Sequence, residues 1–146
     1  MRTIIQRTTG VKLYIDNNLF SESQKGLLVL FGTKEGDNDL LLTKLVDKVV
    51  NLRIFEDSDE KMNLSAIDTN AELMVVSQFT LYANTSKGRR PSFNEAQNPN
   101  DAKLLYDKFI THLKGTGLKI ATGQFGAKMD IQFNNDGPVT ILIDHD

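Results

Sequence analysis

Two segments of the chain carry apolar residues at spacings of three and four, the period of a helix that lays one face on a sheet. The first segment opens at Asp37, a residue type that caps helices well, and runs to Leu52. The second opens with Asn100 as its expected N-cap and ends at Gly115. The apolar residues that set the period are Leu41, Leu42, Leu45, Val46, Val49 and Val50 in the first helix and Leu105, Phe109 and Leu113 in the second.

Most other apolar residues fall in short runs or alternate with polar residues, which is typical of strands. The uninterrupted runs 27–31 and 73–76 indicate strands covered on both faces, and alternation at 129–133 indicates a strand with one exposed face. Gly10 is expected to break the first strand region, and Asp136-Gly137 is expected to turn the chain between the last two strands. The expected strands are residues 3–8, 11–15, 19–23, 26–32, 73–76, 129–133 and 139–143.

Strands at both ends of the chain and helix–strand units in its middle predict a layered, mixed α/β fold with mixed sheets and two main helices. A length of 146 residues predicts one domain spanning residues 1–146. The early charges at the start of the chain do not fit a secretory signal peptide, and no apolar stretch approaches the ~20 residues of a membrane span. We therefore expect a cytoplasmic protein with no membrane partner.

Composition excludes several kinds of chemistry. The chain has no cysteine, which rules out disulfides, thiol catalysis and zinc sites built on cysteine. It has two histidines, His112 and His145, which leaves little for histidine-based catalysis, and we expect His145 to be frayed. The acids at 56–60 lack calcium-loop spacing, so no metal is expected. With 17 basic and 19 acidic residues the net charge is −2, so nucleic acid could bind only at a local basic patch.

The strand at 73–76 leads into Ser77, Gln78 and Thr80, whose polar side chains could face a site at the sheet edge. A hydroxyl nucleophile needs a base within reach, and no histidine or lysine is near Thr80 in the sequence. A structural role for Thr80, such as a hydrogen bond to the backbone, is therefore favoured over covalent catalysis.

One loop concentrates positive charge. Lys87, Arg89 and Arg90 fall within four residues, and no acid follows until Glu95. Arginine and lysine on an exposed loop can bind phosphates, and Phe93 after them can stack on a base or pack inside the protein. The alternative is a solvated loop whose arginines pair with acids of the first helix.

Taken together, these segments resemble the D-aminoacyl-tRNA deacylase family, formerly called D-Tyr-tRNA deacylase. The resemblance covers nearly the whole chain and includes two ordered signatures. The segments that carry it are Met1-Arg2, Gln6-Arg7, residues 26–30, Asp47-Lys48, residues 51–55, residues 61–65, the first signature Ser77-Gln78-Phe79-Thr80-Leu81-Tyr82, residues 87–93, residues 122–129, and the second signature Asn135-Asp136-Gly137-Pro138-Val139-Thr140.

The resemblance implies hydrolysis of the ester that joins a D-amino acid to the terminal adenosine of tRNA. It also implies a homodimer in which Gly137 and Pro138 of one subunit, joined by a cis peptide bond, enter the site of the other. A rigid main-chain wall beside the substrate Cα would admit hydrogen and reject an L side chain. Such a wall cannot exclude glycine, so glycyl-tRNA is expected as a secondary substrate.

The resemblance further implies catalysis with little help from side chains. The 2′-OH of the tRNA would assist a water molecule, and backbone N–H groups around Gln78 and Phe79 would face the ester carbonyl, with Ser77 and Thr80 beside them. Phe125, Gly126 and Met129 would line the adenine site. Lys87, Arg89 and Arg90 are the candidates for phosphate contacts.

No cofactor and no DNA partner are expected. Two other classes stay open from the sequence: a non-catalytic RNA-binding module, and a small-molecule hydrolase that uses Thr80 covalently.

Overall fold

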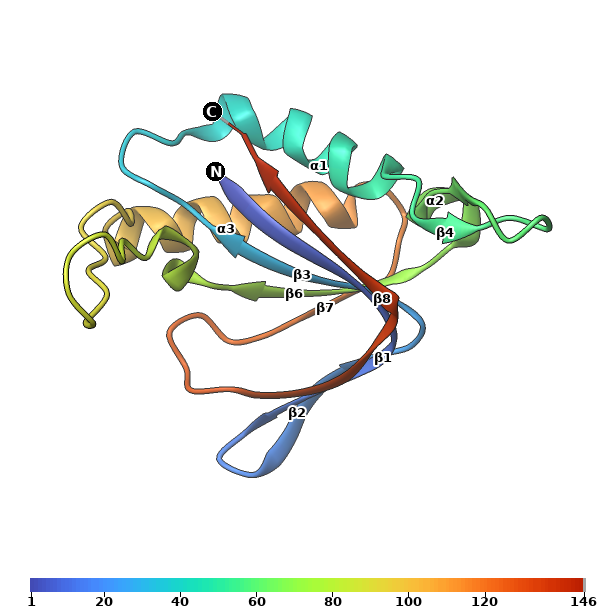
Figure 1. The fold of residues 1–146 in the computed structure, drawn as a ribbon, viewed down its shortest axis with the longest axis horizontal. Helices are drawn as coiled ribbons and strands as arrows, with labels where there is room; N and C mark the ends of the chain where they lie inside the picture. Colours follow the sequence, from blue (N-terminus) through green and yellow to red (C-terminus); the bar gives the residue numbers. More distant parts are fainter. Residues whose placement is uncertain (146) are drawn as a thin grey trace.

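A computed structural model describes residues 1–145, in which a mixed sheet is covered on one face by two long helices (Figure 1). The elements, in chain order, are β1 (Arg2–Ile15), β2 (Asn18–Ser23), β3 (Gly26–Gly32), the 3₁₀ turn η1 (Asp39–Leu41), α1 (Leu42–Asn51), β4 (Phe55–Glu56), β5 (Met62–Leu64), α2 (Ala66–Thr69), β6 (Glu72–Ser77), the 3₁₀ turn η2 (Phe79–Tyr82), α3 (Pro99–Lys114), β7 (Ile120–Thr122) and β8 (Asp130–Asp144). The mixed α/β fold expected from the sequence is confirmed.

The main sheet has the strand order β2-β1-β3-β6-β7, and β8 pairs with β1 outside this path. Strands β3, β6 and β7 run parallel to one another, whereas β1 is antiparallel to β2, β3 and β8. Phe31 of β3 pairs with Ser77 of β6, so the two parallel strands end side by side. The carboxyl edge of a parallel sheet is where ligands of α/β proteins usually bind.

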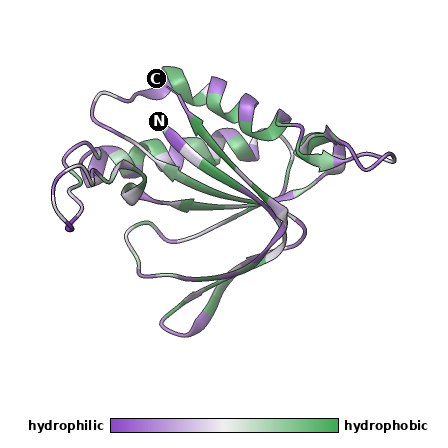
Figure 2. Ribbon diagram, in the orientation of Figure 1, coloured by the Kyte–Doolittle hydropathy of each residue, from purple (hydrophilic) through white to green (hydrophobic). Residues whose placement is uncertain are grey.

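The core lies on both faces of β3. Leu27, Val29 and Phe31 point toward the helices and are buried with Phe109 of α3, whose ring stacks on Phe31 with centroids 4.4 Å apart. Leu28 packs on the opposite face with a second buried cluster that includes residues of β1 and β6. Figure 2 shows β3 and β6 coloured as hydrophobic along their length. The expectation that residues 27–31 form a strand covered on both faces is confirmed.

Both expected helix caps are wrong. Asn38, not Asp37, caps the first helical segment by accepting a hydrogen bond from the amide of Leu40. Asn98 caps α3 through the amide of Asp101, and Asn100 lies inside the first turn. Proline is well suited to the first position of a helix, which explains why α3 starts two residues earlier than expected.

Two expected interruptions of the strands are also wrong. β1 continues through Gly10, which adopts a φ of +153° that residues with a side chain rarely adopt. β8 continues through Gly137, so Asp136-Gly137 does not form a hairpin. Both halves of β8 pair with β1, and the register shifts between Gln6 and Val11, which bends the strand without reversing it. The short elements β4, β5, α2 and β7 have too few residues to show a period in the sequence.

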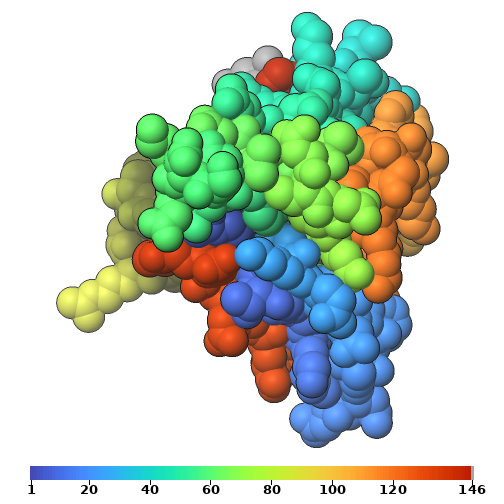
Figure 3. Space-filling model, turned by 90° about the vertical axis from the view of Figure 1, so that its right-hand side faces the viewer, coloured from blue at the N-terminus to red at the C-terminus, as the bar shows by residue number. Residues whose placement is uncertain are grey.

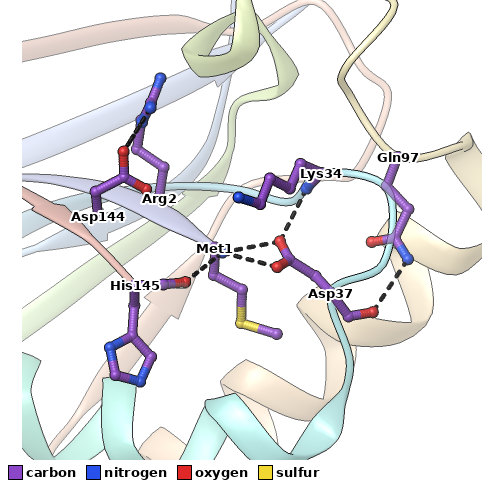
Figure 4. Close-up of polar contacts among 7 residues, drawn as sticks. All are labelled: Met1, Arg2, Lys34, Asp37, Gln97, Asp144 and His145. Carbon is purple, nitrogen blue, oxygen red and sulfur yellow. Dashed lines mark hydrogen bonds and ion pairs between the residues drawn. The ribbon is translucent and has the colours of Figure 1, made fainter.

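The two ends of the chain lie side by side on β1 and β8 (Figure 1). The ammonium group of Met1 lies 2.9 Å from Asp37 and donates a 2.7 Å hydrogen bond to the carbonyl of His145 (Figure 4). The amide of His145 donates in turn to the carbonyl of Met1. The expectation that His145 is frayed is therefore wrong. Among residues 1–145, no helix has the length and apolar character needed to cross a membrane.

Candidate functional site

A cavity of about 650 Å³ opens where β3 and β6 end. One wall contains Ser77, Gln78 and Phe79, and the opposite wall contains residues of the 123–129 loop. The start of α3 and the Thr33 region complete the rim. The six predicted site residues that line this cavity are Ser77, Gln78, Phe79, Phe125, Gly126 and Met129. The structure thus brings together two segments that lie more than forty positions apart in the sequence.

The backbone turns sharply where β6 passes into η2, and this turn leaves two amides unengaged. The amide of Gln78 donates a 2.7 Å hydrogen bond to the carbonyl of Phe31 and so extends the β3–β6 ladder. The amides of Phe79 and Thr80 start the 3₁₀ turn and have no acceptor within residues 1–145, since the first bond of the turn is Leu81 to Gln78. Phe79 lines the cavity, so the donor available at this wall is the amide of Phe79 rather than that of Gln78, and the free amide of Thr80 follows it in the chain.

The side chain of Thr80 is exposed and does not line the cavity. Its hydroxyl accepts a 2.6 Å hydrogen bond from Nε2 of Gln78. Neither histidine lies at the cavity, so no imidazole is placed to take a proton from this hydroxyl. The geometry agrees with a structural role for Thr80.

Among residues 1–145, those that line the cavity are all uncharged and include no Asp, Glu, Lys, Arg or His. Its one titratable side chain is Tyr106, and burial raises the pKa of that phenol. The Tyr106 hydroxyl donates a 2.8 Å hydrogen bond to the carbonyl of Val75, so it is already committed to holding α3 on the sheet. Side chains of this cavity therefore offer no general acid or base near neutral pH.

Aromatic groups form the deeper side of the cavity. Tyr106 and Phe125 lie with their ring centroids 5.9 Å apart. Gly123 is buried beneath Met129, and a Cβ at position 123 would lie 2.6 Å from the sulfur of Met129. This close contact fixes the loop that carries Phe125 and Gly126, and its apolar and aromatic surface is suited to a flat heterocycle.

The basic loop, residues 85–92, leaves the body between η2 and α3 (Figure 1). Its base is closed by paired hydrogen bonds between Asn84 and Ser92. Lys87, Arg89 and Arg90 are exposed and form no ion pair with another residue among 1–145. The structure therefore does not contain the pairing with acids of the first helix that was the alternative reading of this loop.

Gly137 and Pro138 lie at the bend of β8, are exposed, and do not line the cavity of their own subunit. The peptide bond between them is cis. The buried Arg7 supports the bend, with Nε donating to the carbonyl of Asp136 at 2.9 Å and Nη1 donating to the carbonyl of Ile54 at 2.7 Å.

The support of this bend by Arg7 and Asn135 was not predicted from the sequence. Asn135 accepts a 2.6 Å hydrogen bond from the amide of Val139 and donates to the carbonyl of the same residue. The sequence carried no signal for Arg7, because it stands between Gln6 and Thr8 in a strand with many polar residues. Its burial, which requires several acceptors, is visible only in the structure. Among residues 1–145, no group of His, Asp or Glu side chains is arranged to hold a metal ion.

Comparison with known proteins finds relatives over nearly the whole chain. A family model described as D-Tyr-tRNA(Tyr) deacylase matches residues 4–144. A D-aminoacyl-tRNA deacylase of Aquifex aeolicus (strain VF5) is 50% identical over 144 residues, covering 99% of this chain and 97% of the relative. A protein of the same name from Clostridium botulinum (strain Alaska E43 / Type E3) is 49% identical with the same coverage.

Solved structures share the fold. A structure titled c-Myc DNA Unwinding Element Binding Protein superposes with a TM-score of 0.93 at 36% identity, covering 99% of this chain and 98% of that one. A probable eukaryotic D-amino acid tRNA deacylase superposes with a TM-score of 0.84 at 20% identity, covering 97% of each chain. At this identity the similarity supports the fold only. With a family match over nearly its whole length and relatives near 50% identity, the chain belongs to the D-Tyr-tRNA(Tyr) deacylase family.

Proposed function

We propose that this protein hydrolyses the ester between a D-amino acid and the terminal adenosine of tRNA, releasing the free D-amino acid and tRNA. Membership of the deacylase family supports the reaction class. The observation that carries the proposal is the uncharged cavity whose wall contains Phe79, with an amide that has no acceptor among residues 1–145. Such a site stabilises an oxyanion and offers little else, which is suited to an ester that is already activated.

In the proposed reaction, the ester carbonyl oxygen accepts hydrogen bonds from the amides of Phe79 and Thr80. The oxygen of a water molecule bonds to the carbonyl carbon, and the π electron pair of the carbonyl moves onto the carbonyl oxygen. The negative charge that forms on this oxygen faces the two amide donors. The intermediate then collapses, the bond from carbon to the 3′ oxygen breaks, and the 3′ oxygen takes up a proton. The neighbouring 2′-OH of the substrate passes the proton from the attacking water, so no side chain has to act as base.

The adenine would lie against Phe125, with Gly126 and Met129 beside it. Aromatic and apolar side chains are the usual surface for an unstacked base in RNA recognition. Gly126 has a positive φ of +75° and nothing within 4 Å of the position of a Cβ, so the backbone there is open to a ligand. Placing the base here directs the 3′ ester toward the wall formed by Gln78 and Phe79.

Chiral selection would come from Gly137 and Pro138 of a second subunit. In one subunit these two residues are exposed at the bend of β8 and lie away from the cavity, so they can act on substrate only across a homodimer contact. Leu142 of the same strand is 59% exposed, and β8 pairs on one side only, which leaves an edge and an apolar surface for a partner. The inserted main chain would reject an L side chain and admit glycine, so glycyl-tRNA is a proposed secondary substrate.

The basic loop would hold the tRNA backbone through Lys87, Arg89 and Arg90. Because the whole chain has a net charge of −2, attraction for RNA is concentrated at this loop. Hydrolysis of mischarged tRNA would serve as proofreading in translation, which places the proposed activity in the cytoplasm.

The test is deacylation of D-tyrosyl-tRNA beside L-tyrosyl-tRNA at matched enzyme and substrate concentrations. We expect rapid loss of the D ester and preservation of the L ester. Equal loss of both esters would leave an esterase without chiral selection and would contradict the role of Gly137 and Pro138. Loss of neither ester, with tRNA still bound, would leave a non-catalytic RNA-binding module.

A further inference from the structure

Two aromatic rings lie together at the mouth of the cavity. Phe79 opens η2 and is 58% exposed, whereas Phe93 is half-buried. Their ring centroids are 5.0 Å apart and the rings meet edge to face at 69°. The pair therefore presents a rigid aromatic surface to water, which is costly for a group that no part of residues 1–145 covers.

The same two residues are joined to the basic loop. The loop leaves the body after η2 and returns immediately before Phe93, with Asn84 and Ser92 closing its base. In Figure 3 this loop, drawn in yellow, extends beyond the outline of the domain. Both rings also line the cavity. An RNA strand that leaves the cavity toward the cations of the loop would therefore pass over the two rings.

We infer that Phe79 and Phe93 form a stacking platform for the base of the nucleotide that precedes the terminal adenosine. This inference rests on the proposed function. The acceptor end of tRNA is single-stranded, and an unpaired base can replace its lost stacking with an aromatic side chain. Its phosphate carries the negative charge that the unpaired Lys87, Arg89 and Arg90 attract. The site would thus recognise two successive nucleotides, one inside the cavity and one at its mouth.

The charge beside the rings favours RNA over a protein surface as the group that covers them. Protein interfaces place apolar residues at their centre and are depleted of lysine there. A platform next to three cations that have no ion-pair partner among residues 1–145 has the combination of aromatic surface and positive charge that single-stranded nucleic acids require.

The test uses an unacylated RNA trinucleotide that ends in adenosine and carries fluorescent 2-aminopurine in the preceding position. With the wild-type protein we expect quenching of 2-aminopurine on binding, since a stacked base loses its emission. Phe93→Leu should remove most of the quenching and weaken binding about tenfold, the scale of one base–aromatic stack. Phe93→Tyr should retain both, and Phe20→Leu, at a phenylalanine that is 49% exposed on β2, should change neither.

Unchanged quenching in Phe93→Leu would overturn the platform, as would failure of the wild-type protein to quench the probe. A shift of Phe93→Leu from dimer to monomer with quenching intact would assign the rings to a subunit contact and also overturn it. Deacylation of D-tyrosyl-tRNA is measured separately on the same preparations. Quenching without deacylation by the wild-type protein would refute the proposed reaction and leave the platform standing, so the two failures are distinguishable.

Discussion

The ammonium group of Met1 and the carboxylate of Asp37 form an ion pair at 2.9 Å in which both side chains are almost wholly excluded from solvent. The ammonium contacts both carboxylate oxygens of Asp37, and Oδ2 also accepts a hydrogen bond from the amide of Lys34 (Figure 4). The backbone carbonyl of Asp37 accepts a hydrogen bond from the side chain of Gln97. Gln97 and the neighbouring Thr33 line the cavity. The pair therefore ties the residue that precedes β1 to one side of the candidate site.

Replacing Asp37 by asparagine should destabilise the protein by about 3 kcal/mol, because a buried charge is left without its partner. Chemical denaturation measures this change. The matched control is Asp39→Asn, which removes an exposed carboxylate paired with Lys108 and should cost less than about 1 kcal/mol. Equal effects of the two substitutions would show that burial of the Met1–Asp37 pair contributes nothing to stability.

Proline at position 79 should abolish most of the activity. Phe79 is the first residue of η2, where proline fits the backbone and removes one N–H. Loss of one oxyanion donor is expected to lower kcat about 100-fold or more. Phe79→Ala keeps the amide and separates this effect from loss of the ring. If the proline and alanine variants hydrolyse D-tyrosyl-tRNA at the same rate, the amide of residue 79 has no catalytic role.

Alanine at position 80 should leave kcat/KM for D-tyrosyl-tRNA within about fivefold of wild type. The substitution removes one exposed neutral hydrogen bond, that from Nε2 of Gln78, which contributes about 1 kcal/mol. Single-turnover deacylation is the measurement. Complete loss of activity would instead identify Thr80 as a covalent nucleophile.

Alanine in place of Gly137 should reduce D-ester hydrolysis about tenfold or more while tRNA binding is retained. The φ of Gly137 is +137°, and a Cβ there would lie 2.8 Å from a methyl group of Val139 and 3.1 Å from Arg7. Gly36→Ala is the matched control, since Gly36 also has a positive φ, of +87°, but nothing within 4 Å of a Cβ. Full activity with unchanged preference for the D ester would contradict the role proposed for Gly137.

Neutralising the basic loop should lower tRNA affinity and its dependence on salt. We expect the combined changes Lys87→Gln, Arg89→Gln and Arg90→Gln to reduce the slope of log affinity against log salt by about 2 to 3. Lys44→Gln with Lys48→Gln, on the exposed face of α1, should leave the slope unchanged. The measurement is a titration of tRNA binding at several salt concentrations. A wild-type slope for the triple variant of the loop would refute the phosphate contacts.

Local patterns predicted the elements that have a clear period. The apolar spacing at residues 42–50 predicted α1, and the run at 27–31 predicted β3, because these signals lie within a few residues of one another. The cap at Asp37 was wrong because its carboxylate binds an ammonium group 36 positions away, a contact that no local pattern contains.

The site was predictable in part for the same reason. Six of the residues that line the cavity were predicted through resemblance, but their meeting depends on the parallel pairing of β3, β6 and β7. The amide of Gln78 donates to the carbonyl of Phe31, which leaves the amides of Phe79 and Thr80 as the free donors. This difference depends on where the β3–β6 ladder ends. The support of the Gly137 bend by Arg7 likewise depends on contacts more than 120 positions apart.

The unengaged amides at the start of η2 belong to the main chain, which every amino acid except proline supplies. A site built on such donors keeps them through almost any substitution at residues 79 and 80. Substitutions of the surrounding side chains can change its affinity and selectivity, whereas the proposed stabilisation of an oxyanion would persist as long as the fold does. Relatives that have diverged widely in sequence are therefore expected to retain residual esterase activity even after their preferred substrate has changed.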